Sequence, residues 1–217
     1  IETLPADGDE DDLPACGTRH PSGAKSNLQA KSGEFLWMVA ILLKPEHTYI
    51  GGGSLLAPHI ALTAAHKDDS LAGERLLIRA GEWDLASDKE TYPHIDRNVS
   101  EILIRGNHSK AANANNIALL VLELSLSHNP HISSICLPPA TAHVDHANCI
   151  VTGWGQRSTA DRQPVNVLKE LTMPLVPRAE CLQMLQAVRQ RPVRLHASYL
   201  CAGGKKDIDA CVGERQS

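Results

Sequence analysis

The strongest constraint on the fold is a series of short apolar or alternating runs, none longer than nine residues, that continues from Phe35 to Leu175. Turn-forming residues separate the runs, and little helical periodicity lies between them. Many short strands of this kind are typical of an all-β sandwich or barrel. The runs are Phe35–Leu43, Tyr49–Leu56, Ile60–Ala64, Arg75–Ala80, Val99–Arg105, Ile117–Leu124, Cys149–Gly153 and Leu168–Leu175.

One segment departs from this pattern and predicts a helix. It opens at Pro177, a residue that suits the start of a helix. Apolar side chains then recur at helical spacing at Cys181, Leu182, Leu185 and Val188. We therefore expect a single helix after the last of the strands.

The composition excludes several classes of partner. Of the 217 residues 42% are hydrophobic and 21% charged, as in ordinary globular proteins. The net charge of -4, without a Lys/Arg cluster, gives no electrostatic basis for binding nucleic acid or a membrane surface. No apolar run approaches the roughly 18 residues that a membrane span requires. We expect neither nucleic acid nor membrane among the partners.

The cysteines and two glycosylation motifs favour an extracellular protein. The six cysteines form no Cys-x-x-Cys pair and no Cys/His cluster, which disfavours a zinc site and is compatible with long-range disulfides. Asn98-Val99-Ser100 and Asn107-His108-Ser109 are acceptor motifs for N-linked glycans. His143 and His146 have no ligand-spaced companions. We expect a secreted glycoprotein that holds no metal and no cofactor.

The first 33 residues differ in composition from the rest of the chain. Asp7–Asp12 is a self-repelling acidic run, and residues 17–33 offer no apolar face to bury. A cysteine in such a segment of a secreted protein usually tethers it elsewhere. We therefore predict an acidic and polar linker over residues 1–33, tethered through Cys16, and a globular domain over residues 34–217.

A histidine at the end of one apolar run is a candidate for catalysis. The sequence Leu62-Thr63-Ala64-Ala65-His66 places an imidazole on a corner of small residues, which leaves room for partners on both ring nitrogens. A lone histidine in this position is also compatible with a purely structural role. The choice depends on whether the chain supplies His66 with a nucleophile and a carboxylate.

Several stretches, taken in order, resemble the chymotrypsin/trypsin-like serine peptidases. The resemblance implies two antiparallel six-stranded β-barrels with the active site between them, and the second barrel is expected to be truncated at the C-terminus. Further stretches resemble the clip-domain serine protease homologues of insects, the masquerade-like type, which keep the fold and lack peptidase chemistry. The first set is Gly33–Ala40, Leu62–His66, Asn116–Leu120, Ile135–Pro138, Gly153–Gly155, Leu200–Gly204 and Asp209–Gly213; the second is Arg79–Asp84, Pro93–Val99 and Leu195–Gly204.

The resemblance implies which residues occupy the catalytic triad positions, and two of these positions are substituted. His66 matches the base, Asn116 replaces the carboxylate, and Arg215 stands where the serine nucleophile belongs. A guanidinium cannot attack a carbonyl, and an amide in place of the carboxylate holds the imidazole in the wrong tautomer. Asp209 matches the carboxylate that binds a basic substrate side chain, and Gly213 matches one oxyanion-hole donor. The resemblance thus implies a relic of a substrate pocket without peptidase activity, and the alternative for Asp209 is a solvated aspartate in a loop.

The same resemblance implies two disulfides, Cys16–Cys136 and Cys181–Cys201. It leaves Cys149 and Cys211 without partners in this chain, because the family's partner positions lie beyond Ser217.

We expect a secreted, non-catalytic serine protease homologue that acts as a cofactor or regulator by binding proteins in an extracellular, innate-immune or melanisation-type cascade. Its partners would be active serine peptidases or their substrates. The alternative is a trypsin-like serine endopeptidase whose C-terminus is truncated or mis-spliced, because the family pattern ends abruptly after Gly213. A truncated product without a stable fold is the third possibility.

Overall fold

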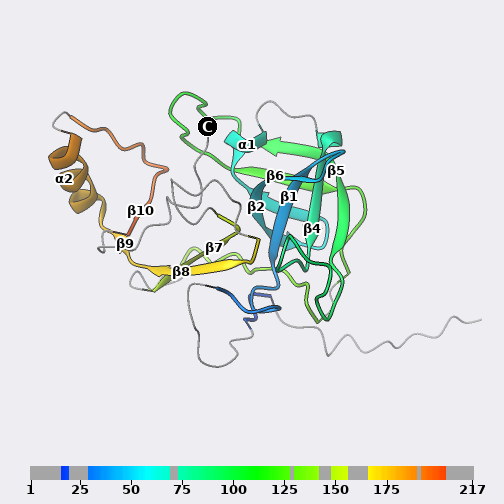
Figure 1. The fold of residues 1–217 in the computed structure, drawn as a ribbon. Coiled ribbons are helices and arrows are strands. Elements are labelled where there is room, and N and C mark those ends of the chain that lie inside the picture. The colour runs from blue at the N-terminus through cyan, green and yellow to red at the C-terminus, as the bar shows by residue number, and fades with distance from the viewer. Residues whose placement is uncertain are drawn as a thin grey trace, which may run out of the picture.

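The computed structural model describes residues 16–19, 29–68, 73–127, 130–141, 148–155, 166–189 and 192–203. Six antiparallel strands close into a barrel in its first half (Figure 1). The prediction of an all-β fold is confirmed, and every barrel strand overlaps one of the expected runs. In the order of their hydrogen bonding, the strands are β1 (Met38–Leu43), β2 (Thr48–Ala57), β3 (Ile60–Thr63), β6 (Ala118–Leu122), β5 (Ile95–Ile104) and β4 (Leu76–Ala80).

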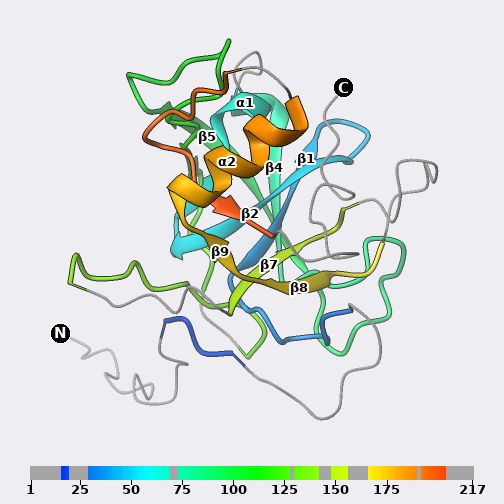
Figure 2. The ribbon, with the colours of Figure 1, turned by 90° about the vertical axis from the view of Figure 1, so that its left-hand side faces the viewer.

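The second half consists of smaller pieces. Strand β7 (Cys149–Gly153) pairs with β8 (Lys169–Met173), and β9 (Leu175–Val176) pairs with β10 (Cys201–Ala202). The expected helix is α2 (Arg178–Arg189), which lies beside β9 and β10 in Figure 2. Within the described ranges these two-stranded sheets do not close, so the expected second barrel is represented only by separate pairs of strands.

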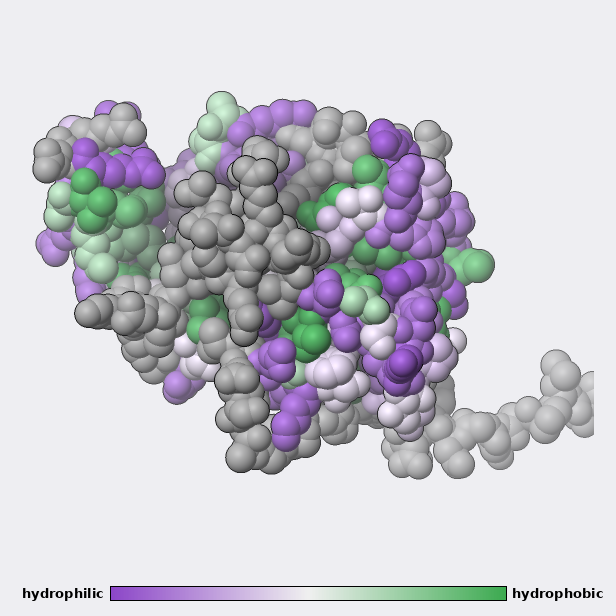
Figure 3. Space-filling model, in the orientation of Figure 1, coloured by the Kyte–Doolittle hydropathy of each residue, from purple (hydrophilic) through white to green (hydrophobic). Residues whose placement is uncertain are grey.

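Apolar side chains remain exposed around α2. Met184 is 43% exposed, Val188 82% and Leu200 84%. Figure 3 shows the corresponding hydrophobic surface over the helix, at the left of the molecule. Of the helices in the described ranges, none has the length and apolarity needed to cross a membrane.

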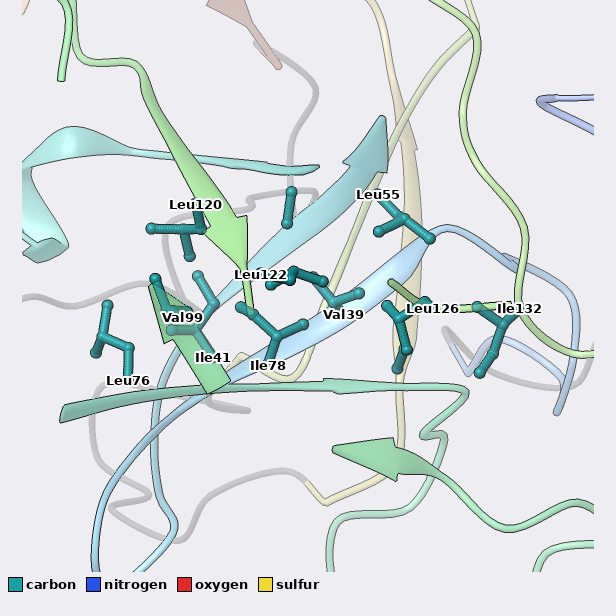
Figure 4. Close-up of a cluster of buried hydrophobic side chains, with 12 residues drawn as sticks. Val39, Ile41, Leu55, Leu76, Ile78, Val99, Leu120, Leu122, Leu126 and Ile132 are labelled. Carbon is teal, nitrogen blue, oxygen red and sulfur yellow. The ribbon is translucent and has the colours of Figure 1, made fainter. Parts of the chain in front are cut away.

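Strand β1 is the wall shared by the two halves. Alternate residues of a strand point to opposite faces, so Val39 and Ile41 enter the barrel while Ala40 and Leu42 face outward, and all four are buried. The outward set belongs to a second buried cluster, which includes Trp154 and Leu168 of the second half. The inward set belongs to the barrel core of Figure 4, with Leu55, Leu76, Ile78, Val99, Leu120, Leu122, Leu126 and Ile132.

The backbone around Trp83 joins the two halves through hydrogen bonds. Its carbonyl oxygen accepts from the Trp154 indole nitrogen at 3.0 Å and from the Leu168 amide at 2.8 Å. The Trp83 indole nitrogen donates to the Ala30 carbonyl at 2.7 Å, and the Leu85 amide donates to Asn166 at 3.0 Å. A single loop of the first half therefore positions the start of the second.

The predicted linker is fixed to the body at several points in its described part, Cys16 and Arg19 among them. Cys16 forms a disulfide with Cys136. Arg19 donates to Glu34 at 2.5 Å and to Glu170 at 2.7 Å, and its guanidinium lies 4.8 Å from the centre of the Phe35 ring. Because the Glu34 side chain is fully buried, this charge-assisted pairing satisfies a carboxylate that burial would otherwise destabilise. The boundary of the domain at residue 34 stays a prediction.

Candidate functional site

The barrel register brings His66 and Asn116 together from distant parts of the chain. Strands β3 and β6 are antiparallel neighbours, with Thr63 opposite Ala118. The segment that leaves β3 and the segment that enters β6 therefore meet at the same end of the barrel. His66 lies three residues after Thr63, in the short helix α1 (Ala65–Asp68), and Asn116 lies two residues before Ala118. The small residue Ala65 is fully buried, which seats the start of α1 against the barrel.

The turn before β6 directs the Asn116 side chain. Asn115 has a φ of 52°, in the left-handed region that asparagine tolerates better than most residues. The Ile117 amide donates to the Asn115 carbonyl at 2.9 Å, which closes a tight turn about Asn116. The Asn115 amide itself donates to the Ser198 hydroxyl at 2.9 Å, so that the second half of the chain also supports this turn.

Two hydrogen bonds fix the orientation of the Asn116 amide against His66. The His66 backbone N–H donates to Asn116 Oδ1 at 2.8 Å. Asn116 Nδ2 lies 2.6 Å from His66 Nδ1. Rotating the amide by half a turn would set its NH₂ group against the backbone N–H, so Nδ2 must be the atom that faces the ring. Because Nδ2 can only donate, Nδ1 of the neutral ring accepts and Nε2 carries the proton.

The predicted nucleophile position and the predicted substrate-pocket residues fall in the part of the chain that the structure does not describe. Asp209, Gly213 and Arg215 lie outside the described residues, and the same is true of Cys211, His143 and His146. Their predicted roles stay predictions. Within the described ranges, no group of three or more His, Cys, Asp or Glu side chains is arranged to hold a metal ion.

The structure contains disulfides at Cys16–Cys136 and Cys181–Cys201, the two pairs that the family resemblance implies. The second of these joins α2 to β10. The two predicted glycosylation acceptors lie in different surroundings: Asn98 is half-buried in β5, and Asn107 is exposed in a turn between β5 and β6.

A second polar cluster, which the sequence did not predict, surrounds Glu82 just after β4. Glu82 Oε2 lies 3.2 Å from His94 Nδ1 and 3.6 Å from Arg79 Nη1. Glu90 Oε1 accepts from the Asp84 amide at 2.8 Å and approaches the Trp83 amide at 3.2 Å, where Glu82 Oε1 also accepts at 3.0 Å. The carboxyls of Glu82 and Glu90 both turn back onto the Trp83 amide. The spacing of the two glutamates in the sequence does not indicate this arrangement.

Burial and the neighbouring carboxyl change the titration of Glu82. The Glu82 residue is only 5% exposed. Burial first, and then the hydrogen bond and charge of Glu90, raise the pKa of Glu82 to about 7, against the opposing effects of the Trp83 amide and Arg79. The pKa of Arg79 is raised chiefly by its hydrogen bond to Asp96. The cluster therefore holds a carboxyl that is protonated over much of the mildly acidic range.

A cavity of about 230 Å³ lies beside this cluster. Tyr92 and His131 stack on one side of it with ring centres 5.0 Å apart, and His131 Nε2 lies 3.0 Å from the Pro93 carbonyl, to which it donates. Gly81 has a φ of 74°, and a Cβ there would lie 2.4 Å from His131 Cδ2, so only glycine fits. The cavity is separate from the His66–Asn116 pair, because none of its lining residues belongs to α1 or to the turn before β6.

Comparisons with known proteins agree on one family. The model of the family described as Trypsin matches residues 25–214. Inactive CLIP domain-containing serine protease A8 of Anopheles gambiae is 35% identical over an alignment of 212 positions, which covers 92% of this chain and 58% of that protein. Phenoloxidase-activating factor 2 of Galleria mellonella is 35% identical over an alignment of 232 positions, which covers 98% of this chain and 76% of that protein.

A solved structure supports the same fold. The Drosophila Grass clip serine protease of the Toll pathway superposes with a TM-score of 0.73 and 25% sequence identity. The match covers 94% of this chain and 60% of that one. The chain thus spans only part of the length of these proteins.

Proposed function

The chain belongs to the trypsin family, and we propose that it is a non-catalytic member that works by binding other proteins outside the cell. Its action would be that of a cofactor or regulator in a proteolytic cascade of the innate-immune or melanisation type. Insect clip-domain serine protease homologues are among its relatives, and one of them carries the word inactive in its name. Another is named as a phenoloxidase-activating factor. These names support a role in such a cascade.

The observation that carries the proposal is the fixed amide of Asn116 against His66. Catalysis by a serine peptidase requires Nε2 of the base to accept the proton of the nucleophile. The contact of 2.6 Å from Asn116 Nδ2 to His66 Nδ1 leaves Nε2 protonated, so it cannot accept. In trypsin, the corresponding change from aspartate to asparagine lowers kcat by about 10⁴-fold. That factor equals about 5 kcal/mol of lost transition-state stabilisation.

The remaining substitutions act in the same direction in this proposal. Arg215 at the nucleophile position supplies no attacking oxygen, so that even a correct imidazole would have nothing to deprotonate. Asp209 and Gly213 would then be relics of the substrate pocket and of the oxyanion hole. No cofactor or metal is part of the proposed action. The partners would be active serine peptidases of the cascade or the substrates of those peptidases.

Hydrolysis of an arginine ester tests the loss of activity. We expect no hydrolysis above the solvent rate from the purified chain, and none from the Asn116→Asp variant, because restoring one triad member does not restore the nucleophile. Incubation with a serine-directed phosphonate should leave the mass of both proteins unchanged. Hydrolysis that the phosphonate blocks would refute the proposal and favour the alternative, a trypsin-like endopeptidase.

Nitrogen NMR of His66 tests the step that carries the proposal. We expect the neutral ring of the wild type to carry its proton on Nε2, and the Asn116→Asp variant to carry it on Nδ1, facing the new carboxylate. The His66→Gln variant identifies the signal. A wild-type ring protonated on Nδ1 would contradict the assignment of the amide.

Binding is tested by reconstitution. The chain is added to an active clip-domain peptidase and its protein substrate, and the rate of substrate cleavage is followed. We expect the rate to change in proportion to the amount of chain bound. An unchanged rate together with no complex on size-exclusion chromatography would contradict a cofactor role.

A further inference from the structure

The two asparagines with glycan-acceptor motifs differ in what their side chains already bind. Asn98 lies within β5, where its neighbour across the sheet is Leu77 of β4. Its Oδ1 accepts from Lys44 Nζ at 2.9 Å, and its Nδ2 donates to Glu123 Oε2 at 3.0 Å. The hydroxyl of Ser100, the third residue of the motif, donates to the Val121 carbonyl at 3.1 Å. The acceptor nitrogen of Asn98 therefore belongs to a chain of polar contacts on the barrel wall.

Asn107 stands in an open turn. The His108 amide donates to the Arg105 carbonyl at 2.9 Å, which places Gly106 and Asn107 at the centre of a β-turn. Asn107 is exposed. Within the described residues its only recorded hydrogen bond uses the backbone, whose carbonyl accepts from Asn115 Nδ2 at 2.9 Å. The side chain of this exposed residue thus has no competing hydrogen-bond partner among the described residues.

We propose that Asn107 carries an N-linked oligosaccharide and that Asn98 does not. The donor would be an oligosaccharide held on a lipid diphosphate, as in secretory compartments. The Asn107 Nδ2 forms a bond to the anomeric carbon of the sugar and loses one proton, while the bond from that carbon to the diphosphate breaks and the lipid diphosphate leaves with the electron pair. The modification rests on the extracellular location in the proposed function. It goes beyond that function by assigning a covalent group to the surface.

The position of Asn107 ties the glycan to the remnant of the active site. Its carbonyl accepts a hydrogen bond from the Asn115 side chain, and Asn116, the residue after Asn115, is hydrogen-bonded to His66. The same loop contacts the second half of the chain, because the Tyr199 hydroxyl donates to the Ala112 carbonyl. Figures 1 and 2 both show the green connection between β5 and β6 beside α1.

An oligosaccharide is bulky and strongly hydrated. A glycan on Asn107 would lie next to the His66–Asn116 pair and would keep polypeptides from binding across this end of the barrel. A partner protein would then bind to another face, or to the glycan itself.

Site-specific mass analysis tests the proposal. The chain is expressed in secreting insect cells with a supplied secretion signal and treated with an amidase that releases N-linked glycans. Release leaves an aspartate in place of each glycosylated asparagine, so we expect the conversion at position 107 and an unmodified residue at position 98. The Asn98→Gln variant should keep the full glycan mass, and Asn107→Gln should lose all of it. Ser109→Ala, which keeps Asn107 but breaks the motif, serves where Asn107→Gln fails to be secreted.

Limited proteolysis tests the shielding. Arg105 and Lys110 are exposed on the same loop, and we expect trypsin to cut after them more slowly in the glycosylated chain than in the Ser109→Ala variant. Cleavage after Arg189, at the end of α2, provides the control and should not differ. A secreted chain with a bare Asn107, a glycan at Asn98, or equal cleavage rates on the loop would each overturn the proposal. Ester hydrolysis remains a separate readout, so the proposed function and the glycan can fail independently.

Discussion

The buried carboxyl of Glu82 should make the stability of the protein depend on pH in an unusual direction. Its pKa is about 7 in the folded protein and has an ordinary value of 4.5. Between these two values the folded state binds the proton more tightly than the unfolded state does, so that the free energy of unfolding falls as the pH rises. This contribution is fully present below pH 4.5 and is lost above pH 7. The difference between the two pKa values corresponds to about 3 kcal/mol.

The Glu82→Gln variant removes the titrating group and keeps its shape. A glutamine can still accept from the Trp83 amide and can donate to Glu90, so we expect it to match the wild type at pH 5. At pH 8.5 it should be more stable by about 3 kcal/mol, because it does not bury a charge. Urea unfolding followed by tryptophan fluorescence, in EDTA to remove stray divalent ions, measures both values. Glu101→Gln, an exposed carboxylate on β5, is the matched control and should follow the wild type at each pH.

Parallel loss of stability in wild type and Glu82→Gln between pH 5 and 8.5 would refute this reasoning. It would mean that Glu82 is ionised in the folded protein throughout, with Arg79 and His94 compensating for burial.

Three further changes have expected outcomes. Replacing Cys16 and Cys136 together by alanine opens a loop with a sequence separation of 120 and should lower the free energy of unfolding by about 5 kcal/mol, measured by urea titration; an unchanged midpoint would contradict the tether. Ile78→Ala empties a fully buried position in the barrel core and should cost about 2–5 kcal/mol, whereas a cost near zero would mean that the core is not packed as described. Trp154→Phe removes the donor to the Trp83 carbonyl and should cost about 1–2 kcal/mol while amide exchange quickens in the second half more than in the barrel.

The barrel could be predicted from the sequence because its strands carry their own signal. Runs such as Phe35–Leu43 and Arg75–Ala80 contain the apolar residues that the barrel buries, and β1 and β4 lie within them. The start of β5 was missed: the run was expected from Val99, and the strand begins at Ile95. Its first residues include Asp96 and Arg97, whose charged side chains interrupt the apolar pattern typical of a strand. Pairing with β4, and not intrinsic strand propensity, makes these residues extended.

The elements that depend on long-range contacts could not be predicted in the same way. Strands β9 and β10 have two residues each, too few for any pattern, and their pairing accompanies the disulfide from Cys181 to Cys201. The pairing of Arg19 with Glu170 crosses 151 positions, and nothing local to either residue indicates it. The four-residue helix α1 is likewise too short to show periodicity.

The site was predictable to a different extent. The resemblance to the peptidases selected His66 and Asn116 from residues that are 50 positions apart, and the β3–β6 register brings them into contact. The orientation of the Asn116 amide could not be read from the sequence, because it depends on the backbone N–H of His66. Glu82 lay within a stretch used only for the resemblance, and its burial depends on how the loop folds back through Glu90.

The bond between Cys16 and Cys136 encloses the intervening chain in one covalent ring. A single peptide bond cut between Arg19 and Gln29 would open this ring without releasing either end. The product would be two polypeptides that travel as one particle until a reductant separates them, and the Arg19–Glu34 ion pair would hold the shorter one in place. In such a molecule a proteolytic cut changes how the chain is connected without any loss of mass. The protein can therefore be cleaved while every part stays attached.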